Sequence, residues 1–140
     1  MTVGIGWFDG DILRHNGFTV HENPSYDGLF KTTAINRIDL FCRSATEIKG
    51  EYEKHLHINQ LTYDRTKAFY YPFPNVFYLN KNNTLAIDRV TVGLQRALED
   101  GSFEELWKKS AALSTDFIRI NSRQVFYLEN PLLGGEEKAL

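Results

Sequence analysis

The sequence predicts an α/β fold built on a parallel sheet, and three observations support this expectation. Residues 2–6, 18–21 and 38–42 form short segments rich in apolar or β-branched side chains. Segments of helical periodicity alternate with them, in the order that is typical of right-handed βαβ units. The third short segment is almost continuously apolar, as a strand covered on both faces requires.

Helix boundaries in the first half follow from capping residues. Asp9 can cap a first helix, which Gly17 ends. Ser25 opens a second helix, and Asn36 is suited to end it in the left-handed conformation. Residues 44–47, Ser-Ala-Thr-Glu, fit a capping box, so a third helix is expected to begin there.

The character of the sequence changes after residue 54. Residues 55–57 are expected to form a short further strand. Residues 66–80 are dense in Phe and Tyr and contain Pro72 and Pro74. Because proline cannot donate a hydrogen bond to a sheet ladder, these two residues predict a bend between two extended pieces.

Two helices and a late strand are predicted in the last third of the chain. Asn82 and Asn83 precede an amphipathic helix that ends at residues 100–101. Its apolar stripe consists of Leu85, Ile87, Val90, Leu94, Ala97 and Leu98. Residues 102–105 form a second capping box at the start of the next helix, and residues 123–128 alternate as a strand does.

Composition limits the classes of protein to which the chain can belong. Its 140 residues can bury one core but hardly two, and the formal net charge of −2 gives no basic footprint for nucleic acid or anionic lipid. No apolar run approaches the roughly 20 residues of a membrane-spanning helix, and the N-terminus lacks the features of a secretory signal peptide. The single cysteine, Cys42, is interpreted as an inert core thiol.

Sequence signatures of catalysis are missing, so the chain is not expected to be an enzyme. It has no Walker-type phosphate loop, no G-x-S-x-G elbow and no H-E-x-x-H motif. Gly4-x-Gly6 resembles half of a dinucleotide fingerprint, but Asp9 stands where the third glycine belongs. His55 and His57 lack further metal ligands nearby and are interpreted as solvated surface histidines. No metal and no cofactor is expected.

Five residues are candidates for a binding site at one edge of the predicted sheet. Trp7 and Asp9 follow the first strand, Tyr26 starts the second helix, and Arg43 and Ser44 follow the third strand. The carboxyl ends of parallel strands meet at one edge, where ligands bind in open α/β sheets, and helix N-termini there favour an anionic group. In the alternative interpretation, Trp7 is a packing residue and Arg43 is a surface charge.

Several segments, taken in order, resemble amino-acid-type (type II) periplasmic solute-binding proteins. They are residues 3–7 (VGIGW), 11–18 (DILRHNGF), 26–31 (YDGLFK), 36–41 (NRIDLF), 98–107 (LEDGSFEELW) and 123–133 (RQVFYLENPLL). The resemblance extends over most of the chain. The order and spacing of these motifs carry it more than any single motif does.

The resemblance implies a periplasmic-binding-protein-like fold, in which two α/β lobes close on a small solute. The chain would be the solute-binding component of an ABC-type uptake or sensing system in the periplasm, with the solute and the ABC transporter membrane subunits as partners. Trp7, Asp9, Arg43 and Ser44 would contribute to the site. Ser44 departs from the family, which often places there an Asp that grips an amino group. The alternative function is an interaction or regulatory module that keeps the fold but binds no solute.

The resemblance also implies how the chain is divided. Residues 2–64 would form the second lobe, residues 65–133 the return crossover strand and C-terminal helices of the first lobe, and residues 134–140 a flexible tail. The stretch that builds most of the first lobe in the family has no counterpart in the sequence. Residues 69–78 would then lack their usual cover, so the chain is not expected to be a stable monomer, and a homodimer or strand exchange between copies would cover this surface.

Overall fold

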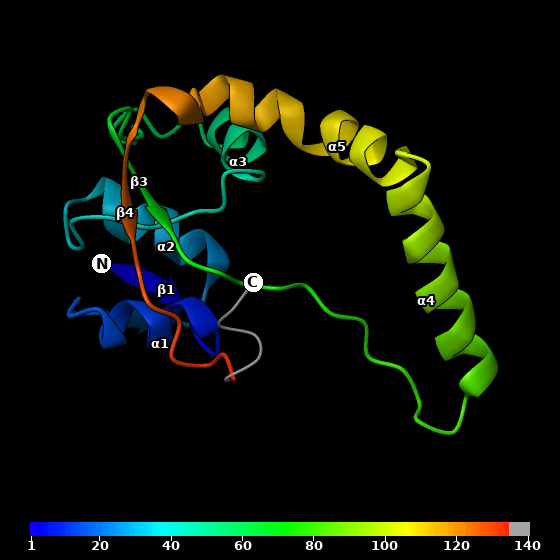
Figure 1. Ribbon diagram of the computed structural model, residues 1–140. Helices are drawn as coiled ribbons and strands as arrows, with labels where there is room; N and C mark the ends of the chain where they lie inside the picture. The colour runs from blue at the N-terminus through cyan, green and yellow to red at the C-terminus, as the bar shows by residue number, and fades with distance from the viewer. Residues whose placement is uncertain (135–140) are drawn as a thin grey trace.

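Figure 1 shows the computed structural model, in which residues 1–134 are described. The elements are β1 (Thr2–Gly4), α1 (Phe8–His15), β2 (His21–Asn23), α2 (Tyr26–Ala34), α3 (Ile48–Lys54), β3 (Lys67–Tyr70), α4 (Thr84–Glu99), α5 (Ser102–Ile118), a 3₁₀ turn (Ile120–Ser122) and β4 (Gln124–Tyr127). The first five elements and the β3–β4 pair gather on one side, whereas α4 and the N-terminal half of α5 form an arm that extends away from them. Residues 135–140, and with them most of the expected tail, lie outside the described residues.

The first sheet confirms the expectation of an α/β fold with parallel strands. β1 pairs in parallel with β2, so that Thr2 lies opposite His21 and Gly4 lies opposite Asn23. Thr2 also forms a parallel bridge with Phe41. β1 is therefore the central segment, and β2 and the chain around Phe41 flank it.

The second strand is displaced from its predicted position at residues 18–21. The backbone N–H of Phe18 donates to the carbonyl of Leu13 at 3.1 Å, so this residue still belongs to the C-terminal turn of α1. Pairing with β1 begins only at His21. Phe18 lies outside the sheet and instead packs against Phe69, with 5.3 Å between the ring centres.

The prediction of a strand over residues 38–42 is wrong, apart from the bridge at Phe41. The backbone N–H groups of Arg37 and Ile38 still donate to the carbonyl of Thr32 at 3.0 and 3.3 Å. The chain therefore leaves the end of α2 too late to run a full strand beside β1. The carbonyl of Leu40 nevertheless accepts the N–H of Thr2 at 3.0 Å, which fixes the position of this segment.

Some helix ends follow the predicted caps. The side chains of Ser25 and Asn83 cap α2 and α4, each accepting a backbone N–H at 3.1 Å. Gly17 and Asn36 adopt the left-handed conformation after α1 and α2, with φ angles of 87° and 56°.

The caps predicted at Asp9, Ser44 and Ser102 are wrong. Trp7 and Gly101 hold the N-cap positions of α1 and α5, without a side-chain hydrogen bond in either case. Ser44 precedes α3, which begins at Ile48, and its hydroxyl instead accepts a nearby loop N–H. In each case the helix begins without a capping hydrogen bond from the side chain that was expected to provide it.

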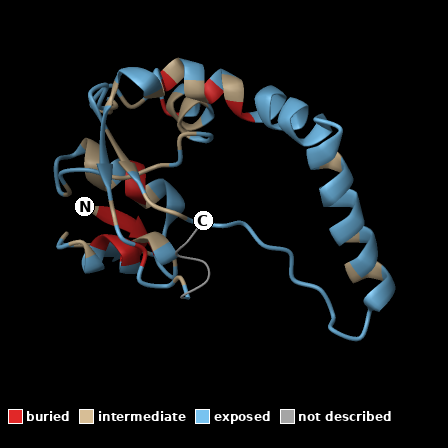
Figure 2. Ribbon diagram, viewed as in Figure 1, coloured by how far each residue is buried: buried red, intermediate tan, exposed pale blue. Residues whose placement is uncertain are grey.

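The hydrophobic core lies between the first sheet and helices α1 and α2 (Figure 2). Its most buried members are Val3, Ile12, Leu13, Leu29 and Phe30. They come from β1 and from the inner faces of the two helices. The loops that follow β1 and precede α2 are therefore held on a packed base.

His55 belongs to this core and is not the solvated surface histidine that the sequence suggested. It lies in a turn after α3, where a strand over residues 55–57 was expected. Its ring stacks on that of Phe30 at 3.7 Å between centres, and its Nδ1 is 2.8 Å from the carbonyl of Glu51. Stacking on the apolar face of the Phe30 ring removes the His55 ring from water and holds the turn after α3 against α2.

A second parallel pair joins β3 to β4, with Lys67 opposite Gln124. The late strand predicted from alternation is thus confirmed. Of residues 66–80, only those of β3 form a strand, and the rest run as an extended segment toward α4 (Figure 1).

The C-terminal half of α5 packs on α3. Ala111, Ser114 and Ile118 are buried along one face of α5, and the Ser114 hydroxyl accepts the backbone N–H of Lys49 at 3.4 Å. α4 has no such support, since none of its residues is buried. The colouring of Figure 2 shows how burial stops where α5 leaves α3.

We expect Leu29→Ala to lower the free energy of unfolding by about 2–5 kcal/mol, because it opens a cavity in the core. Leu29 is 0% exposed, whereas Leu56 is 58% exposed and offers a matched control. Leu56→Ala should change the stability by less than about 0.5 kcal/mol. Urea unfolding at one fixed protein concentration measures both values, and equal losses would contradict the assignment of the core.

Candidate functional site

Three of the five candidate residues come together beyond the carboxyl end of β1. Trp7 caps α1, Tyr26 begins α2, and Arg43 follows the bridge residue Phe41 by two positions. The guanidinium carbon of Arg43 lies 5.0 Å from the ring centre of Trp7, 5.4 Å from that of Phe41 and 5.8 Å from that of Tyr26. Aromatic faces attract a cation, so these rings form a rim around Arg43.

The guanidinium of Arg43 binds the carboxylate of Glu51, which α3 supplies. Nε donates to one carboxylate oxygen at 2.6 Å, and Nη2 donates to the other. The Tyr26 hydroxyl donates to the same carboxylate. We refer to Trp7, Tyr26, Phe41, Arg43 and Glu51 as the Arg43 cluster.

The Arg43–Glu51 pair is largely withdrawn from water. The side chains of Arg43 and Glu51 are 14% and 13% exposed, while Glu47, which accepts a further hydrogen bond from Arg43 at 2.9 Å, is 53% exposed. Removing charges from water costs free energy, which two parallel charge-assisted hydrogen bonds offset. The arrangement therefore depends on both partners of the pair.

Protonation in the cluster follows from these contacts. Burial acts to raise the pKa of Glu51, but hydrogen bonds from Arg43 and Tyr26 outweigh it, and the pKa lies below its ordinary value. Burial and the hydrogen bond to Glu51 raise the pKa of Tyr26 to about 12. For Arg43, burial acts to lower the pKa, but the bonds to Glu51 prevail and raise it. At neutral pH the cluster holds one carboxylate, one guanidinium and one neutral phenol.

Glu51 and Glu47 are not among the site residues predicted from the sequence. A signal was available, since Arg43, Glu47 and Glu51 are spaced four residues apart. On a helix, side chains four residues apart are neighbours, and opposite charges at this spacing attract. Arg43 lies before the start of α3, so the helical rule alone does not predict its fork-like contact with Glu51.

The other two candidates, Asp9 and Ser44, lie outside the Arg43 cluster. Asp9 accepts a hydrogen bond from the Tyr71 hydroxyl, which ties α1 to the segment after β3. The Ser44 hydroxyl lies 2.9 Å from that of Thr46 and shapes the loop before α3. Burial raises the pKa of the nearby Cys42 thiol to about 11, although the residue is half-buried and not a member of the core.

Gly4 allows Trp7 to take its place in the cluster. The end of β1 is buried, and a β-carbon at Gly4 would overlap the indole ring of Trp7. Glycine is therefore required here for close approach of a side chain to the backbone. Contact with Trp7 therefore explains the first glycine of the Gly4-x-Gly6 pattern, and a nucleotide-binding role is not needed to explain it.

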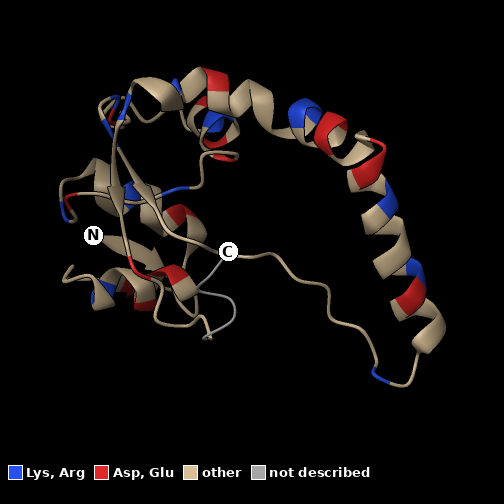
Figure 3. Cartoon of the chain, in the orientation of Figure 1, with Lys and Arg blue, Asp and Glu red and all other residues tan. Residues whose placement is uncertain are grey.

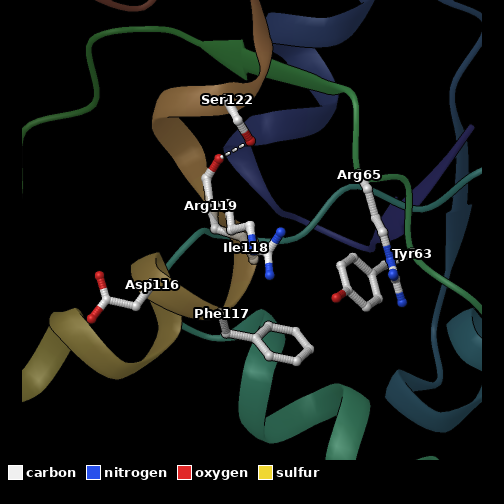
Figure 4. A pocket seen from close by; sticks show the side chains of 7 residues that line it. All are labelled: Tyr63, Arg65, Asp116, Phe117, Ile118, Arg119 and Ser122. Atoms are coloured by element: carbon white, nitrogen blue, oxygen red, sulfur yellow. Dashed lines mark hydrogen bonds between the residues drawn. The ribbon is translucent and has the colours of Figure 1, made fainter.

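An open depression of about 460 Å³ lies elsewhere, between the end of α5 and the loop before β3 (Figure 4). It is lined by Tyr63, Arg65, Asp116, Phe117, Ile118, Arg119 and Ser122. Figure 4 shows Tyr63 and Arg65 on one side and Phe117 and Arg119 on the other, and Arg65 lies over the Tyr63 ring at 5.1 Å. No candidate site residue lines this depression.

Comparison of the chain with models of protein families, with curated proteins and with solved structures found no match. Within residues 1–134, no group of three or more His, Cys, Asp and Glu side chains is arranged to hold a metal ion. In the same part of the chain, no helix is both long enough and apolar enough to cross a membrane.

We expect Glu51→Gln to make stability less dependent on acid pH. The folded-state pKa of Glu51 is lowered below the ordinary value of 4.5, so its carboxylate stabilises the fold above about pH 4.5. This contribution is lost as the pH falls through the folded-state pKa. The free energy of unfolding in urea, measured at pH 7 and pH 3, should therefore fall less in Glu51→Gln than in the wild type.

The matched control is Glu53→Gln on the same helix, because the Glu53 side chain is 58% exposed. It should behave as the wild type does. An identical fall from pH 7 to pH 3 in the wild type and in Glu51→Gln would show that the Arg43–Glu51 pair does not contribute as described.

Proposed function

We propose that the chain is the solute-binding component, or part of one, of an ABC-type uptake or sensing system. Its ligand would be a small polar or anionic solute such as an amino acid, and its site the Arg43 cluster. ABC membrane subunits would be its protein partners and the periplasm its compartment. The sequence resemblance and the geometry around Arg43 support this proposal together.

The observation that carries the proposal is that Arg43 binds a carboxylate through two parallel hydrogen bonds within a rim of aromatic rings. Guanidinium forks recognise carboxylates through paired N–H groups, which lysine cannot reproduce. Trp7 and Tyr26 add flat apolar area next to the charge, and such area binds the carbon skeleton of a small ligand. The cluster also lies past the carboxyl end of β1, where open α/β sheets bind ligands.

In the described structure the fork holds the chain's own Glu51. A solute carboxylate would bind by exchange with Glu51, and Tyr26 would then be free to donate to the solute. Exchange requires α3 to shift or the Glu51 side chain to turn. The internal carboxylate thus acts as a competitor that lowers the affinity for any external one.

A second function, an interaction or regulatory module that binds no solute, is favoured by the same contact. If Glu51 never leaves Arg43, the pair is a structural clasp that joins α3 to the loop after Phe41. The two functions predict different effects on ligand affinity when Arg43 and Glu51 are substituted separately.

We expect Arg43→Lys and Glu51→Ala to change ligand affinity in opposite directions. Arg43→Lys loses the fork and should weaken binding about thirtyfold, since hydrogen bonds to charged groups contribute about 2 kcal/mol. Glu51→Ala removes the competitor and should strengthen binding about tenfold. Two-dimensional amide NMR titrations of the 140-residue chain with each common amino acid measure these affinities down to the millimolar range.

Glu53→Ala is the matched control on α3 and should leave the affinity unchanged. The structural-clasp function instead predicts that no amino acid shifts the signals of the Arg43 cluster. It also predicts that Glu51→Ala lowers stability without creating affinity. That pair of results would overturn the solute-binding proposal.

A further inference from the structure

The arm formed by α4 and the N-terminal half of α5 exposes much apolar surface. Leu98 is 66% exposed on α4, and Trp107 is 56% exposed on α5. Further exposed apolar side chains of the two helices are Leu85, Val92, Leu94, Phe103, Leu106 and Leu113. The segment that leads to the arm adds Phe77 and Tyr78, which are exposed as well. Apolar surface on this scale marks an interface with another molecule.

The apolar side chains of the arm follow the spacing of helix–helix seams. On α4, Ile87, Val90, Leu94 and Ala97 are separated by three, four and three residues. On α5, the apolar residues Phe103, Leu106, Leu113 and Phe117, with the polar Ser110 between them, are separated by three, four, three and four residues. Alternation of three and four places side chains on one stripe that packs against another helix. We refer to these two stripes as the arm seam.

One end of the seam shows what kind of contact it makes. The adjoining face of α5 is covered by α3 at Ala111, Ser114 and Ile118, and Phe117 contacts the ring of Tyr52 from α3 at 5.8 Å. Toward the N-terminus of α5 this cover ends, although the seam continues through Leu106 and Phe103, which are both exposed. The uncovered part therefore fits a further helix in the position that α3 takes at the other end.

The total exposed area agrees in scale with a missing partner. The chain of 16.2 kDa exposes 10508 Å², whereas a compact monomer of this mass exposes about 7,500 Å². The excess is on the order of 3,000 Å². Stable homodimer interfaces bury about 2,000–5,000 Å² in total. The excess exposed area of two copies together is therefore large enough to form one such interface.

Charge permits two arms to meet. Figure 3 shows both signs interspersed along α4 and α5. On α5, Glu104 pairs with Lys108 at 2.5 Å and Glu105 pairs with Lys109 at 2.7 Å, and none of the four is a seam residue. α4 carries two acidic and two basic residues. α4 is therefore balanced, and α5, with Asp116 as a third acidic residue, carries one net negative charge, which is too little to keep identical arms apart or to require a charged partner.

We propose that the arm seam docks against the same seam of a second copy, in a dimer with two-fold symmetry. A second copy presents helical stripes of the same spacing, and self-complementary contacts of this kind are the commonest in soluble oligomers. The interface would lie on the arm, away from the Arg43 cluster, so that dimerisation and solute binding are separate properties.

The test is analytical ultracentrifugation of the wild type and of charge-insertion variants over about 1–100 µM. Leu94→Lys and Leu106→Lys insert a charge into the seam at exposed positions, where it does not disturb the core. Gln95→Lys adds the same charge one residue away, outside the seam, and is the matched control. Circular dichroism verifies that each variant keeps its helices.

The wild type and Gln95→Lys should sediment as dimers, and the two seam variants should dissociate with a Kd raised at least about thirtyfold. A wild-type monomer at 100 µM would overturn the proposal, whether its arm folds back on its own body or awaits a different partner. A dimer that both seam variants retain, or that Gln95→Lys also disrupts, would overturn it equally.

Discussion

The hydrogen-bonded pair between Arg43 and Glu51 is the interaction on which the arrangement of the first half depends. Arg43 stands on a loop, Glu51 on α3, and the rings of Trp7 and Tyr26 come from the starts of α1 and α2. One guanidinium therefore joins four segments that no long sheet connects, since the segment around Phe41 contributes only a bridge to β1. α3 in turn packs against the C-terminal half of α5.

If the solute-binding proposal holds, the same pair would serve both as a structural contact and as part of a binding site. A guanidinium between aromatic rings holds whichever carboxylate is nearest, and in this chain a neighbouring helix supplies one. Burial makes the contact costly to break without a replacement. A solute with a carboxylate offers a replacement of the same chemistry, whereas a neutral solute does not. Under the solute-binding proposal, the cluster would therefore favour ligands that carry a carboxylate.

The sequence predicts the class of fold and much of the cluster because strand–helix alternation and capping act locally. Trp7, Tyr26 and Arg43 follow from that alternation, since each stands where an element begins or a predicted strand ends. The predicted strand at residues 38–42 is wrong for a non-local reason. Its apolar composition is typical of a strand, but the backbone N–H groups of Arg37 and Ile38 are hydrogen-bonded in the turn that ends α2. The four-residue spacing from Arg43 indicates only that Glu51 is a possible partner, and the docking of α3 is what brings Glu51 to Arg43 and the buried His55 to Phe30.

The most direct test of this account is a double-mutant cycle between Arg43→Met and Glu51→Gln, measured by urea unfolding at pH 7 and one fixed protein concentration. If the pair joins the four segments as described, each single variant should be destabilised and the double variant should recover part of the loss. The coupling energy should then be about 1–3 kcal/mol. A coupling energy within about 0.3 kcal/mol of zero would contradict the account, because the two residues would then contribute independently of each other.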